Sequence, residues 1–410
     1  VMGVLESRVL DFENVIITSV NEGKFPAGKS QNSFIPYDVK KELGLPTYKE
    51  KDAIYCYHFY HLLLRAKNVW LLYNTDNEGI DAGEKSRFIT QLEIEKQPKH
   101  NITSTIYNAV LPEKAYEPVT IPKTDKILTR LHEIATDKGF SPSSLTNYIR
   151  NPLQFYMQRI LRINEADEVE ENIAVNTLGT IIHNALEELY TPYLNQFLAL
   201  HHIESMEAKI DEVILKHFKE IYKEGEITKG KNLLAFEVAK RNVYNFLQLE
   251  KKDIESDQAI KVLLLEASLS CEIEVKSLPF SIKIAGKVDR IEERNGAIRI
   301  IDYKTGKVDG NSLKINDFTD LTSDIKNEKI IQLLCYALMF ENHELKQNRE
   351  VSAGIVSFKN MKSGFLPFGL GKGKDADVVI SIEILEDFKA ELETLILEIF
   401  NAEIPFKEKV

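Results

Sequence analysis

Apolar and polar positions follow different periods along the chain, and the changes divide it into parts. Over residues 1 to about 100, two short apolar runs flank an aromatic-rich stretch, AIYCYHFYHLLLRA. The runs predict strands over 14–20 and 68–73, and the stretch predicts a buried helix over 50–66. Between 97 and 140 the periodicity fades and prolines recur, a pattern typical of a linker or crossing segment.

From Ser141 onward the pattern is first helical and then has a period of two. Ser141 is a predicted N-cap, because Pro142 follows it at the first helical position. The turn Asn295-Gly296 predicts a tight hairpin between two strands. Three helices, three strands, a helix, a strand and a closing helix are predicted, over 176–200, 204–223, 232–255, 262–275, 280–294, 297–304, 327–342, 351–358 and 382–400. This region is therefore mixed α/β.

Composition narrows the class of protein without deciding its function. The 410 residues are 43% hydrophobic and 28% charged, with a net charge of -11. This excess of acid argues against unspecific coating of nucleic acid but is compatible with an enzyme that acts on DNA at a metal site. No apolar run is long enough for a bilayer and no signal peptide is visible, and Cys56, Cys271 and Cys335 lie far apart. We expect a cytoplasmic protein without a membrane segment, and a fragment of something longer.

The stretch GKFPAGKS, from Gly23 to Ser30, matches the phosphate-binding loop of an ATPase. Such a loop must follow a strand and open a helix, whose free amides hold the phosphates. A strand precedes it, but Pro36 would break a following helix after barely one turn. We interpret the match as accidental and expect no ATP hydrolysis by this chain alone.

The strongest chemical signal is GKVDRIEERNGAIRIIDYKTG, over 286–306. Asp302 and Lys304 are two residues apart on one strand, so their side chains share a face, and the hairpin brings Asp289 alongside. Two carboxylates and a lysine on one patch form a site for a hard cation such as Mg²⁺. Charged strand residues are more often a solvated face; here Asp302 follows an apolar run, which favours a site.

These residues resemble the D…(D/E)xK signature of the restriction-endonuclease-like nuclease fold, in its RecB-type branch. That branch also has a helical G-x-x-x-H, matched by Gly179 and His183. The resemblance implies a mixed central sheet flanked by helices over 141–410. It also implies that His183, Asp289 and Asp302, with a main-chain carbonyl near Tyr303, hold Mg²⁺ or Mn²⁺. Without the family, a lone helix histidine is usually a core residue.

The family's next element is Q-x-x-x-Y on a helix, matched by Gln332 and Tyr336. Positions four apart share a helix face, so the resemblance implies that both side chains reach the site with Lys304. A buried polar pair in a core helix is the alternative. Glu266, on the preceding strand, is a further acidic candidate that the expected ligand set leaves out.

The first part of the chain resembles the second motor domain of UvrD-like helicases. Its strand leads into an E-G-x-x-P loop, Glu22 to Pro26, and LLRAKNVWLLYN and SRFITQL resemble later segments of AddB-like proteins. We therefore expect a RecA-like remnant over 1–96, a linker over 97–140 and a nuclease domain over 141–410. Tyr57 stands where the ATP-sensing arginine is expected. Asn151 stands where AddB-type nucleases place an iron–sulfur cysteine, so we expect no cluster.

The resemblance predicts the C-terminal part of an AddB/RecB-like helicase–nuclease subunit, a metal-dependent DNA nuclease that degrades DNA ends in recombinational repair. Its implied partners are DNA and an AddA/RecB-type helicase subunit. The alternative is a non-catalytic scaffold of the same fold, which EDTA would not affect. Four nearby basic residues either guide the DNA backbone or are solubilising surface, namely Lys283, Lys287, Arg290 and Lys307.

Overall fold

The chain divides into two compact units, Val1–Lys114 and Ala115–Val410. The computed structural model describes residues 2–3, 6–26, 35, 37–75, 83–107, 116–163, 173–222, 229–371, 373 and 376–409. Most of the segment after the accidental phosphate-loop match therefore lies outside the described residues. Among the described helices, none has both the length and the apolar character that crossing a membrane would need.

The first unit contains a two-stranded parallel sheet and a small aromatic core. Strands β1 (Asn14–Ile17) and β2 (Asn68–Leu71) pair in register, and the helices are α1 (Tyr37–Glu42), α2 (Tyr48–Leu64) and α3 (Arg87–Ile94). Phe59 stacks on Phe88, with ring centroids 5.0 Å apart. The strand predicted to reach residue 20 ends at Ile17, before the positive φ of Ser19. Two strands do not show a RecA-like domain, and that interpretation stays a prediction.

A five-stranded mixed sheet forms the centre of the second unit, as the pattern predicts. Its order is β4-β5-β6-β8-β9, and only the β6–β8 pair is parallel. Asn295 and Gly296 both have positive φ, which a type I′ hairpin turn requires. The strands are β4 (Ile260–Glu274), β5 (Ser281–Arg294), β6 (Ala297–Lys304), β8 (Val351–Ser357) and β9 (Phe365–Pro367).

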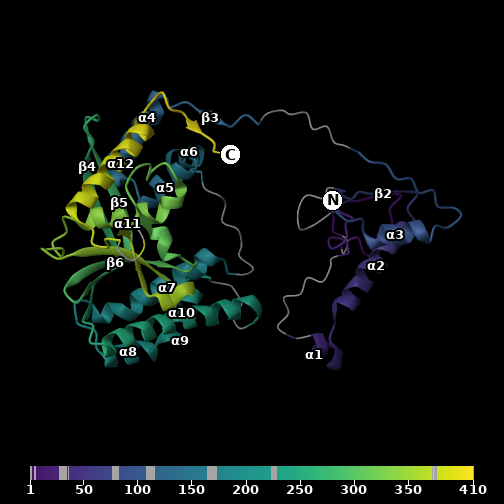
Figure 1. The fold of residues 1–410 in the computed structure, drawn as a ribbon, viewed down its shortest axis with the longest axis horizontal. Coiled ribbons are helices and arrows are strands. Elements are labelled where there is room, and N and C mark those ends of the chain that lie inside the picture. The colour runs from purple at the N-terminus through teal and green to yellow at the C-terminus, as the bar shows by residue number, and fades with distance from the viewer. Residues whose placement is uncertain are drawn as a thin grey trace. The chain divides into compact units, whose positions relative to one another are not determined.

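Helices cover both faces of this sheet (Figure 1). One face carries α4 (Asp125–Glu133), α5 (Pro142–Arg150), α6 (Pro152–Phe155), α11 (Glu328–Phe340) and α12 (Ile382–Phe400). The other carries α7 (Val175–Tyr190), α8 (Leu200–Glu207), α9 (Ile210–Ile221) and α10 (Gly230–Glu255). A short pair, β7 (Lys314–Ile315) and β10 (Gly369–Leu370), lies outside the main sheet.

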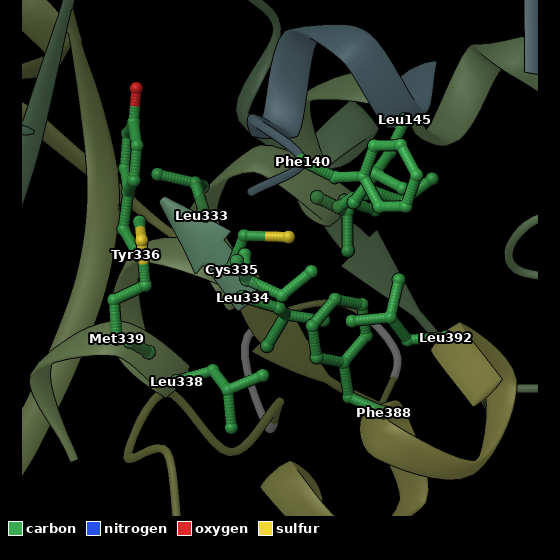
Figure 2. Close-up of a cluster of buried hydrophobic side chains, with 14 of the residues drawn as sticks. Phe140, Leu145, Leu333, Leu334, Cys335, Tyr336, Leu338, Met339, Phe388 and Leu392 are labelled. Atoms are coloured by element: carbon green, nitrogen blue, oxygen red, sulfur yellow. The ribbon is translucent and has the colours of Figure 1, made fainter. Parts of the chain in front are cut away.

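The core on the α11 face is the larger of the two. Nearly every residue of α11 is buried, because the helix packs between the sheet, α5 and α12. Figure 2 shows Leu334 near Phe388 and Leu392, whereas the Tyr336 ring points away from these two side chains. One helix therefore anchors the core and still presents a polar edge.

Two predictions about the helical segments need correction. The helix predicted over 176–200 ends at Tyr190, because Pro192 cannot continue it. The segment interpreted as a linker over 97–140 contains α4, whose Leu131 is fully buried in the large core. Within the same segment, β3 (Thr120–Ile121) pairs with β11 (Phe406–Lys407) near the end of the chain.

Candidate metal centre and active site

The site begins where β5 and β6 separate. The two strands are paired from the hairpin as far as Arg290 and Ile301. Beyond that point the Asp289 carboxylate takes the place of a strand partner, and its Oδ2 accepts a hydrogen bond from the backbone N–H of Tyr303 at 2.7 Å. This bond fixes Asp289 against the next strand and leaves Oδ1 facing α7.

His183 and Glu266 complete a three-residue group around Asp289. On α7, His183 Nδ1 lies 3.4 Å from Glu266 Oε1 and 3.6 Å from Asp289 Oδ1. Candidate ligand atoms of the three side chains all lie within 4.8 Å of one another. Glu266 falls opposite Asp289, between the pairs Leu265–Arg290 and Ala267–Val288, and its φ of +46° departs from regular strand geometry.

The charges in this group are balanced in the absence of a cation. Burial alone would lower the pKa of His183, but the carboxylates of Asp289 and Glu266 outweigh it and raise the pKa to about 10. Burial likewise raises the pKa of Glu266, but His183 and Lys287 together bring it below its ordinary value. Lys287 Nζ lies 2.8 Å from Glu266 Oε2. The histidine is therefore an imidazolium at neutral pH and holds the two acids together.

Asp302 and Lys304 form the other half of the site, as the alternation along β6 predicts. Lys304 Nζ lies 2.8 Å from Asp302 Oδ2. Asp302 is almost fully buried, which raises its pKa to about 6; Lys304 opposes this shift and Asp289 reinforces it. Asp302 is outside the His183–Glu266–Asp289 group, but its charge acts on the same space.

Gln332 and Tyr336 project from α11 towards Asp302. Gln332 Nε2 donates to Asp302 Oδ1 at 2.9 Å and lies 2.6 Å from Tyr336 Oη. Burial raises the pKa of Tyr336, and the charge of Asp302 adds to this, so the phenol stays protonated. Both oxygens of Asp302 are therefore held by neighbours, Oδ1 by Gln332 and Oδ2 by Lys304.

Tyr303 supports the site from the other face of β6. Its ring meets His183 edge-on at a centroid distance of 5.6 Å and meets Phe246 of α10 at 5.5 Å. The side chain is buried and orients His183, while the backbone N–H holds Asp289. This placement agrees with a main-chain role for Tyr303, whose carbonyl is the expected ligand.

The four basic residues near the hairpin have different positions. Arg290 cannot guide DNA, because it is fully buried and paired with Glu250. This corrects the expectation, which followed from its place on a charged strand. Lys287 and Lys307 are exposed, and the Lys283 ammonium donates to the Asp137 carbonyl at 3.2 Å.

Glu266 is the residue that the sequence-based ligand set lacked. Only the β4–β5 register places it beside Asp289, although it lies 23 positions earlier in the chain. The detectable signal was a single acid inside the apolar run VLLLEASL.

The donor set fits a divalent cation. One imidazole nitrogen and several carboxylate oxygens converge, a combination that suits Mg²⁺ or Mn²⁺. Three acids are gathered in a largely buried site, which a cation would compensate.

The fold and these residues define a nuclease-type domain, and comparison with known families agrees. Residues 139–410 match the PD-(D/E)XK nuclease superfamily. The chain belongs to this superfamily, whose members cleave phosphodiester bonds and typically use divalent metals.

Its relatives are distant and considerably longer. An uncharacterized protein of Rickettsia conorii is 20% identical over 73% of this chain and 33% of its own length. One from Rickettsia typhi is 25% identical over 43% of this chain and 20% of its own. One of the subunits of the ATP-dependent helicase/deoxyribonuclease of Streptococcus agalactiae serotype Ia is 24% identical over 45% and 16%, respectively. The chain thus spans a third or less of the length of these relatives.

Proposed function

We propose that this chain is a metal-dependent DNA nuclease that degrades DNA from its ends. The observation that carries the proposal is the convergence of His183, Glu266 and Asp289 beside the Asp302–Lys304 pair. Membership of the superfamily supports phosphodiester cleavage. The net charge of -11 does not oppose it, because the acids that matter are gathered at one site.

In this proposal His183, Asp289, Asp302 and the Tyr303 carbonyl hold Mg²⁺ or Mn²⁺, and Glu266 joins or replaces one of them. A bound divalent cation polarises the scissile phosphate and lowers the pKa of a coordinated water. For His183 to offer a lone pair, it must give up the proton that it shares with Asp289 and Glu266.

Lys304 and Gln332 act on the substrate in this proposal. When Asp302 turns to the cation, Lys304 loses its partner at 2.8 Å and its ammonium becomes available to the phosphate oxygens or the attacking water. Gln332 keeps Asp302 oriented through Oδ1, with Tyr336 beside it. The α11 pair therefore positions the acid rather than reacting itself.

We further propose that the chain is the C-terminal part of an AddB/RecB-like protein that processes double-strand breaks with an AddA/RecB-type helicase partner. Partial similarity to one component of a helicase/deoxyribonuclease supports this context. In that setting the first unit is what remains of a motor domain, and the motor delivers the DNA end.

The experiment is degradation of end-labelled linear DNA, single- and double-stranded, with Mg²⁺ or Mn²⁺ and with EDTA. We expect metal-dependent cleavage that falls at least a hundredfold in Asp302→Ala, in line with removal of a group that acts in the transition state. Glu274→Gln is a matched control, because Glu274 is an exposed acid on the strand that carries Glu266. DNA binding without cleavage by the folded, metal-loaded protein would instead indicate the scaffold.

A further inference from the structure

A second pocket lies on the α10 face of the sheet, within the second unit. Its volume is about 360 Å³. The apolar walls come from α10, β8 and the segment around β9, among them Phe246, Leu249, Val356 and Phe365. The charged groups come from the paired ends of β5 and β6 and from α10. Such a mixture of apolar walls and a few charged groups is typical of a small-ligand site.

Most of the charged groups around this pocket already have partners. Glu250 and Glu292 each lie 2.5 Å from Arg290, which is fully buried behind them. Arg294 lies 2.9 Å from Glu292 and 2.5 Å from Asp253. These acids and arginines form one network in which every carboxylate is engaged, so none of them is available to a cationic ligand.

Arg299 is the exception. Its guanidinium lies 4.9 Å from the centroid of the Phe365 ring, and within the described part of the chain it has no ion pair or hydrogen bond. Burial lowers the pKa of Arg299, and the nearby Arg294 lowers it further. A half-buried guanidinium with five donors and no acceptor carries an unmet demand for an anion.

We propose that this pocket binds a monoanionic carboxylate attached to an apolar body. Arg299 receives the carboxylate in a bidentate manner, and Phe246, Leu249 and Phe365 surround the apolar part. A dianion such as a phosphate monoester fits less well, because Asp253 and Glu292 are also at the lining. Both a free aryl acid and the carboxyl terminus of a peptide have the required chemistry.

The pocket is separate from the candidate metal centre. Along β6, Arg299, Ile301 and Tyr303 share the α10 face, whereas Asp302 points to Gln332 of α11. The proposal therefore stands independently of the nuclease activity, and binding can be measured with EDTA present.

The test is isothermal titration of the full chain in EDTA with 3-phenylpropanoate, its neutral amide, phenyl phosphate, and acetyl-Gly-Phe with a free or amidated carboxyl terminus. We expect a dissociation constant on the order of 1 mM for at least one free carboxylate. Both amides should be undetectable, and phenyl phosphate should be weaker. Binding by the free acid alone identifies a small metabolite-like acid as ligand, and binding by the peptide alone identifies a chain terminus.

Variants make the assignment specific. Arg299→Gln should weaken binding about tenfold or more. Arg241→Gln should not, although Arg241 also lies over an aromatic ring, Tyr244, on the outer side of α10. Val378→Trp, which fills the pocket from its exposed rim, should abolish binding with Arg299 intact. Absence of binding by any carboxylate, or equal binding by Arg299→Gln or Val378→Trp, would overturn the proposal.

Discussion

At the scale of single residues, the site stores its cost in protonation states. With its pKa near 10, His183 is an imidazolium at pH 8, where Asp302 is already ionised. A cation can bind the imidazole only after the proton has left. We therefore expect release of about one proton per Mn²⁺ bound at pH 8, measured by titration calorimetry in buffers of different ionisation enthalpy. His183→Ala should release almost none, and His201→Ala, an exposed histidine, should behave as wild type.

Asp302 should destabilise the protein when no metal is bound. Its folded-state pKa of about 6 is above the ordinary 3.8, so the folded form binds the proton more tightly. The resulting stability is fully present below pH 3.8 and is lost as pH rises through 6. In EDTA at pH 8, Asp302→Asn should raise the free energy of unfolding by roughly 1–3 kcal/mol.

Denaturant titrations at pH 8 and pH 5 measure this effect. The advantage of Asp302→Asn should shrink at pH 5, where much of the wild-type carboxyl is protonated. A variant that is less stable than wild type at pH 8 would mean that the Lys304 ion pair outweighs burial. The same substitution should remove cleavage, as expected where a functional group is kept at the expense of stability.

At the scale of elements, α7 approaches the site through a glycine. Gly179 is one turn before His183, and a Cβ there would meet Thr305 at 3.7 Å, an ordinary contact. The protein therefore tolerates alanine, and Gly179→Ala should stabilise the helix by up to about 1 kcal/mol. If the DNA backbone passes over this turn, KM should rise several-fold while metal affinity is unchanged. Unchanged KM and kcat would place the DNA elsewhere.

Local chemistry explains which parts of the site were predictable from the sequence. The spacing of Asp302 and Lys304 and the Asn295-Gly296 turn determine a shared face and a hairpin within about twenty residues. Glu266 depends instead on the register of two long strands and on an unusual backbone angle. No pattern in the surrounding sequence encodes either.

The same reasoning applies to the elements themselves. The strands of the central sheet and the last helix have long, regular apolar patterns, and α12 has the predicted bounds, 382–400. Helix α4 is short and lies among prolines, and its Leu131 is buried by residues far away in sequence. Its role follows from tertiary packing, which single-segment periodicity does not contain.

At the scale of the whole molecule, the second unit is closed by its own ends. The C-terminal β11 pairs with β3, and Phe406 is fully buried beside Tyr148 and Tyr156. Lys123, which follows β3, donates to the Glu398 carbonyl at 2.7 Å. The stretch before residue 141 is therefore part of the unit that carries the site.

Two fragments test this closure. Residues 116–410 should fold and unfold cooperatively, whereas residues 141–410 lack β3 and α4 and should be less stable by several kcal/mol. Loss of buried Leu131 alone accounts for roughly 2–5 kcal/mol. Denaturant unfolding compares the fragments, with Phe406→Ala in the longer one expected to lose about 3–5 kcal/mol and the more exposed Ile404→Ala little. Equal stability of the two fragments would show that the segment before 141 is a linker after all, and would place the domain boundary where the sequence alone suggested it.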